Sequence, residues 1–183
     1  MSHPTSVARR RIGVGLCAAV LSCTAAGPAL GDDAGSRRHV QTRLKSYQEV
    51  PSVSSPAGGR FRASLDGASQ SLHYELAYSG LEGDVRQAHI HFGQHGVNGG
   101  IMVWLCQTAF NVSPVASTPA CPQAGTVSGV ITAAEVVGPA GQGIAPAEFT
   151  EMLAAIRAGV AYVNVHSSKF VGGEIRGQLR DDD

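Results

Sequence analysis

Short segments that alternate apolar and polar side chains follow one another along most of this chain. In the clearest of them, residues 72–78, Leu72 and Leu76 fall on one side of a strand, and His73 and Glu75 on the other. A period of two predicts strands with one buried and one solvent-facing side. The run over residues 101–106 is almost wholly apolar, which is typical of a strand buried on both sides. Further strands are predicted over residues 39–45, 60–65, 85–91, 125–132, 159–166 and 174–179.

One segment, residues 147–158, has the helical period instead. Phe149, Met152 and Ile156 form an apolar stripe at spacings of three and four, and Gly159 ends the segment. Turn-forming residues separate the other segments, and no repeat divides the chain. The prediction is an all-β fold, an antiparallel Greek-key-like β-sandwich with one short helix. The sandwich should span residues 47–180, after an extension over 32–46 that holds a first strand and before an acidic, solvated tail at 181–183.

The first 31 residues have the pattern of an export signal. Arginines at positions 9–11 precede an apolar run from Ile12 to about Thr24, and small residues occupy positions 29 and 31. The run is too short to span a bilayer comfortably. We therefore expect cleavage near Gly31 and a periplasmic or extracellular protein that begins at Asp32. A loose lipoprotein motif ends at Cys23, so attachment of a lipid to Cys23 is the alternative to cleavage near Gly31. No other segment of the sequence is long and apolar enough to span a membrane.

Charge and cysteine content narrow the classes of function. Fourteen Lys and Arg balance fourteen Asp and Glu, so the chain lacks the basic excess typical of nucleic-acid binding or attachment to a membrane surface. Beyond the signal only Cys106 and Cys121 remain. In an oxidising compartment an even pair predicts a disulfide, here closing the loop 107–120. Metal-binding thiolates are the alternative, but neither cysteine has a close cysteine or histidine partner in sequence.

Three histidines form the most specific candidate site. On a strand over 85–91, His89 and His91 share one side while Ile90 packs on the other. His166 lies in a second predicted strand, and three neutral imidazoles in an oxidising location fit copper or zinc, with copper favoured by the Irving–Williams order. The alternative is that the rings are hydrogen-bonded or exposed without a ligand.

Other polar residues extend this candidate site. His95, in the glycine-rich turn, is either a fourth ligand or an exposed side chain. Asn164 could orient a ligand by bonding its second nitrogen, or could cap a turn. Arg176 could steer an anionic substrate or pair with a carboxylate such as Glu174. Met102 could be a soft axial ligand, although a methionine in an apolar strand is usually core.

Several motifs together resemble the CHRD domain, named after chordin and found in many exported bacterial proteins. The resemblance covers residues 48–179, with a mild departure where Ser52 replaces an expected second proline. It implies a β-rich extracytoplasmic domain, with copper binding in some members. The matching segments are residues 48–51, 78–81, 88–91, 96–99, 105–106 with 121–122, 161–166 and 172–179.

The histidine pattern also resembles the copper site of Cu/Zn superoxide dismutase. That resemblance implies His89, His91 and His166 as copper ligands and superoxide as the small molecule that meets the metal; the family's histidine- and aspartate-rich zinc loop is missing. A copper-only, superoxide dismutase-like enzyme is therefore the first hypothesis. Non-catalytic copper sequestration and a structural or adhesive module are the alternatives, and an exposed sheet edge would permit a homo-oligomer.

Overall fold

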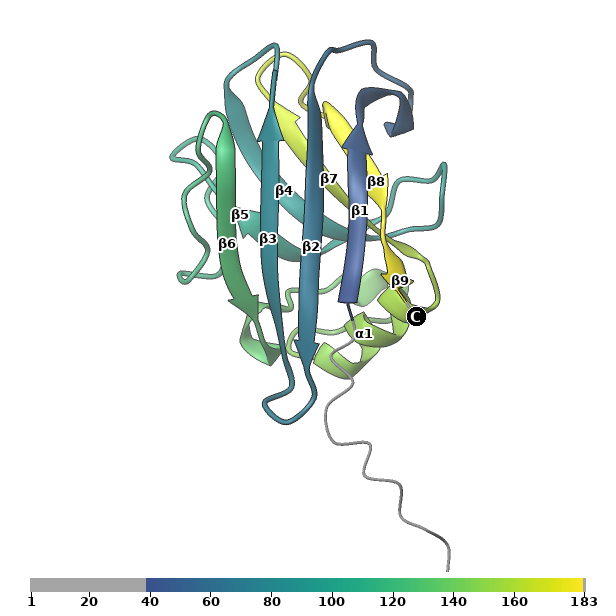
Figure 1. Cartoon of the computed structure of the whole chain (residues 1–183). Helices are drawn as coiled ribbons and strands as arrows, with labels where there is room; N and C mark the ends of the chain where they lie inside the picture. The colour runs from purple at the N-terminus through teal and green to yellow at the C-terminus, as the bar shows by residue number, and fades with distance from the viewer. Residues whose placement is uncertain (1–38, 183) are drawn as a thin grey trace, which may run out of the picture. The chain divides into compact units, whose positions relative to one another are not determined.

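The structure is a computed structural model that describes residues 39–182, with side chains to Arg180. The predicted signal peptide, Cys23 and Asp183 lie outside the described residues. One antiparallel sheet forms two facing layers (Figure 1). The strands are β1 His39–Lys45, β2 Gly58–Asp66, β3 Ser71–Ser79, β4 Val85–Phe92, β5 Gly100–Cys106, β6 Gly125–Ile131, β7 Ala161–Ser167, β8 Ile175–Gln178 and β9 Arg180–Asp182. The helices are α1 Phe149–Arg157 and the short 3₁₀ turns Ser46–Gln48, Ala133–Glu135 and Ala140–Gln142.

The strand order is β5-β4-β7-β8-β1-β2-β3-β6, with β9 paired to β1. In Figure 1, β1, β2, β3 and β6 form the front layer, and β4, β5, β7 and β8 form the layer behind it. The two ends of the sheet approach each other, because Val103 in β5 pairs with Val136, shortly after β6. This almost closed arrangement confirms the all-β fold with one short helix.

The core lies between the two layers and follows the alternation in the sequence. Leu72 and Leu76 are buried, whereas His73 and Glu75, on the other side of β3, are exposed as predicted. The back layer differs, because every residue of β7 is buried. Its outward-facing positions are therefore covered by other parts of the chain, although several of them are polar.

Several strand ends differ by one or two residues from the sequence-based prediction, and two other differences have a clear structural reason. The helix begins at Phe149 and not at Ala147, because Ala147 has a positive φ of 69°, which a right-handed helix excludes. The chain is still paired at residues 181 and 182, where an acidic tail was expected, because β9 continues the sheet beside β1. The end of the helix at Gly159, with φ of 69°, agrees with the prediction.

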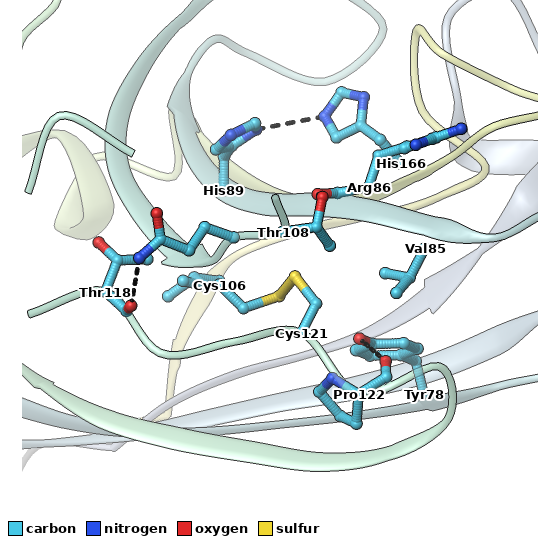
Figure 2. The surroundings of a disulfide bond; sticks show 12 residues. Tyr78, Val85, Arg86, His89, Cys106, Thr108, Thr118, Cys121, Pro122 and His166 are labelled. Carbon is cyan, nitrogen blue, oxygen red and sulfur yellow. Dashed lines mark hydrogen bonds between the residues drawn. A yellow bond between two sulfur atoms is a disulfide. The ribbon is translucent and has the colours of Figure 1, made fainter. Parts of the chain in front are cut away.

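The predicted disulfide is confirmed. Cys106, the last residue of β5, is bonded to Cys121. Nearby, the hydroxyl of Tyr78 donates to the carbonyl of Pro122, so the same loop is also fastened to β3 (Figure 2). Among the described residues, no helix is long and apolar enough to cross a membrane.

Candidate metal centre

The three predicted histidines converge on the outward side of the back layer. His89 and His91 come from β4 and His166 from the neighbouring strand β7. One ring nitrogen of each lies within 4.8 Å of the corresponding nitrogens of the other two. All three are buried, with exposed fractions of 0%, 7% and 6% respectively.

Strand pairing explains why these residues meet. β4 and β7 are antiparallel, with Gln87 opposite His166 and His89 opposite Asn164. Because side chains alternate along each strand, His89, His91 and His166 all point away from the core, while Ile90 points into it. In Figure 2 the disulfide lies on one side of β4, and the rings of His89 and His166 lie on the other.

Backbone carbonyls fix the orientation of two rings. His91 Nδ1 donates to the carbonyl oxygen of Gly99 at 2.9 Å, and His166 Nδ1 donates to that of Val171 at 3.0 Å. A carbonyl can only accept, so both nitrogens carry the proton. In the neutral imidazoles, Nε2 then carries the lone pair that a metal ligand needs; that of His166 faces His89 Nδ1 at 3.2 Å and Asn164 Oδ1 at 3.0 Å.

The third ring is held differently. His89 Nδ1 lies 3.2 Å from His166 Nε2, and the edge of the His89 ring meets Trp104 with ring centroids 4.4 Å apart. The Nε2 atoms of both His89 and His91 are buried without a hydrogen-bond partner. Unpartnered buried polar atoms are costly, and a bound cation would remove that cost.

Burial keeps the imidazoles neutral. It lowers the pKa of His91 to about 4, helped by the nearby His166 and opposed by the bond to Gly99. Burial, together with the neighbouring His166 and His91, lowers the pKa of His89 further, and burial also lowers that of His166. At neutral pH three lone-pair donors therefore face a common region, so this donor set fits a transition metal such as copper or zinc.

Asn164 lies beside this cluster and connects it to a buried carboxylate. Its Oδ1 is 3.0 Å from His166 Nε2, whereas the second nitrogen of that ring bonds the carbonyl of Val171, so a role of Asn164 in orienting the ligand stays a prediction. Its Nδ2 faces Gly173, where a Cβ would meet both this nitrogen, at 2.8 Å, and the carboxylate of Glu49. Burial raises the pKa of Glu49 to about 7, against the opposing effects of Arg176, of the Val50 amide and of Asn164.

Arg176 fastens the loop that runs past the cluster, residues 93–99, which we call the β4–β5 loop. Its guanidinium donates to the side-chain oxygen of Asn98 and to the carbonyls of Gln94 and Val97. It also lies 3.4 Å from the centroid of the Tyr162 ring, on which the His91 ring stacks with an interplanar angle of 3°. Only 2% of the surface of Arg176 is exposed, and its hydrogen bonds hold this loop in place. Its role in steering an anion stays a prediction.

The remaining candidates lie outside the cluster. His95 is exposed in the β4–β5 loop and is not among the residues that the described structure groups as a metal site. Met102 is fully buried in the hydrophobic core. The sequence analysis missed Glu49, Trp104 and Tyr162. Glu49 belongs to a family-like segment, but nothing in the sequence indicates that its side chain is buried beside Asn164.

Comparison with known proteins gives one match. No curated protein and no solved structure matches the chain. The family model of the CHRD domain matches residues 40–179, which include all three clustered histidines and, apart from His39 at the start of β1, every strand except β9. The chain therefore belongs to the CHRD domain family.

Proposed function

We propose that this protein is an exported domain that binds one copper ion through His89, His91 and His166. The observation that carries the proposal is the convergence of three buried, neutral imidazole nitrogens within 4.8 Å. His91 and His166 would bind through Nε2, because their Nδ1 atoms are committed to backbone carbonyls. Copper is favoured over zinc because divalent affinity for a nitrogen site peaks at Cu²⁺.

The proposed activity is the dismutation of superoxide. A bound copper would supply one-electron chemistry: one superoxide is oxidised to oxygen, and a second, with two protons, is reduced to hydrogen peroxide. The chain's own residues would hold the ligands in place, with Asn164 beside His166 and the stacked Tyr162 behind His91. A rigid set of ligands changes little in geometry between two oxidation states.

Non-catalytic copper binding is the second candidate. It is favoured by the low exposure of the site, since none of the three rings is more than 7% exposed. A closed site retains an ion well but slows the entry of a small molecule. Access past the β4–β5 loop therefore distinguishes a catalyst from a protein that sequesters copper.

The test is to load the purified protein with Cu²⁺ and record its electron paramagnetic resonance spectrum and metal content. We expect one copper per chain, with nitrogen hyperfine lines that the double variant His89→Ala/His91→Ala loses. His73→Ala is the matched control, because His73 is exposed on another strand. Unchanged stoichiometry in the double variant would refute the site, and a superoxide-decay assay on the loaded wild type separates catalysis from sequestration.

Export is tested separately. We expect the protein recovered from outside the cytoplasm to begin at Asp32, as N-terminal sequencing can show. A mature chain that begins at Cys23 and carries lipid would instead support the lipoprotein alternative.

A further inference from the structure

A basic hollow lies on the outer surface of the sheet, beside β1 and next to the β4–β5 loop. Its volume is about 720 Å³. None of the three clustered histidines lines it, so it is separate from the candidate metal centre. The lining residues are Gln41, Thr42, Arg43, Lys45, Gln48, Arg60, His95, Gln178 and Arg180.

Four cationic side chains gather there, and none of the lining residues whose side chains the structure describes is acidic. Arg43 and Lys45 come from β1, Arg60 from β2 and Arg180 from β9, and all four are exposed. Among the side chains that the structure describes, none of the four has an ion pair; the ion pair found there joins Lys169 and Glu82. The formal net charge of the whole chain is zero, so this concentration of one sign is local.

The pairing of β1 with β2 brings two positive charges together, which lowers the stability of the sheet. Arg43 and Arg60 are directly opposite each other in the register of β1 and β2. Like charges at directly opposed positions destabilise a sheet. No ion pair among the described side chains offsets this repulsion, whereas an anion bound between the two guanidinium groups would.

The spacing and the groups present define the ligand. Neighbouring strands are about 5 Å apart and alternate residues on one strand about 7 Å, so the backbone positions of the four cationic residues together span more than a single phosphate group. Guanidinium groups match the oxygens of phosphate in a two-point geometry. The amides of Gln48 and Gln178 add neutral polar groups to the lining.

We propose that this hollow binds a small soluble ligand that carries several phosphate groups. Its concave form suits a soluble anion better than the flat surface of a membrane. The cationic side chains of Arg43, Lys45 and Arg60 would provide the binding energy, and His95 and Gln48 also line the hollow. Binding does not depend on a metal at the three histidines.

Inorganic tripolyphosphate is the probe, and isothermal titration calorimetry of the purified protein is the measurement. We expect saturable binding that the double variant Arg43→Gln/Arg60→Gln weakens by about tenfold or more, as the loss of charge-assisted hydrogen bonds predicts. Arg157→Gln is the control, because Arg157 is exposed at the end of α1 and does not line the hollow. Copper content should be equal in all three proteins.

Three results would overturn the proposal. The first is no binding of tripolyphosphate by the wild type. The second is an equal loss of affinity in Arg157→Gln, which would indicate attraction by overall charge alone. The third is binding only to phosphatidylcholine vesicles that contain phosphatidate, which would assign the surface to a membrane. The double variant should have a melting temperature equal to or above that of the wild type, because it loses a like-charge repulsion. This result shows that a loss of binding is not caused by unfolding.

Discussion

The buried carboxyl of Glu49 makes a sharp prediction about stability and pH. Its exposed fraction is 4%, and burial raises its pKa from 4.5 to about 7. The folded protein therefore holds this proton more tightly than the unfolded chain does. Between pH 4.5 and about 7 the folded state binds more protons, so this group's contribution to the free energy of unfolding falls as pH rises.

Replacing Glu49 with Gln removes the titration and nearly preserves the shape. A pKa difference between 4.5 and about 7 corresponds to about 3 kcal/mol. The metal-free variant should therefore match the wild type below pH 4.5 and exceed its free energy of unfolding by up to about 3 kcal/mol above pH 7. The histidines titrate in both proteins, so their effects cancel in the difference.

Urea denaturation across this pH range, with a chelator present, measures the difference directly. Glu75→Gln is the matched control, because Glu75 is exposed on β3. A difference that does not vary with pH, or a wild type that gains stability over the variant as pH rises, would refute the reasoning. Either outcome would mean that the Glu49 carboxyl is solvated or paired more strongly than its surroundings indicate.

Three further predictions concern the candidate site and its supports. Because burial lowers the pKa of His91 to about 4, copper affinity should be nearly constant from about pH 7.5 to about pH 6 and fall only towards pH 4; a competition titration that shows a steep fall above pH 6 would contradict this. Arg176→Met should lower the free energy of unfolding by about 3 kcal/mol and speed hydrogen exchange in residues 94–99, whereas Arg86→Met should leave that exchange unchanged. Cys106→Ser/Cys121→Ser should lower the free energy of unfolding by about 3 kcal/mol, the value expected for a disulfide of sequence separation 15. An unchanged denaturation midpoint would show that the loop is ordered without the disulfide.

The fold could be predicted from the sequence because its signals are local. A strand with one buried side must alternate, and residues 72–76 alternate without exception. The exposed His73 and the buried Leu72 and Leu76 follow from that pattern alone. The start of the helix could not be read in this way, since the positive φ of Ala147 depends on the turn that precedes the helix.

The candidate site was only partly predictable. The spacing of His89 and His91 determines that they share one side of a strand. The approach of His166 depends on β4 and β7 being neighbours, although His89 and His166 have a sequence separation of 77. Tyr162 and Asn164 share one side of β7, and Arg176 lies opposite Asn164 on β8, but Glu49 joins them only because β1, which precedes it, pairs with β8. Contacts of this kind carry no periodic signal, so sequence patterns could not reveal that Arg176 is buried against a loop.

The carbonyl of Gly99 links the position of the β4–β5 loop to the chemistry of His91. It keeps the proton on Nδ1 and the lone pair on Nε2. Without this bond the ring would be free to rotate and to change tautomer. A metal held by Nε2 would then lose a well-aligned ligand, so Arg176, which binds the loop through Gln94 and Val97, would lengthen the time that such an ion stays bound.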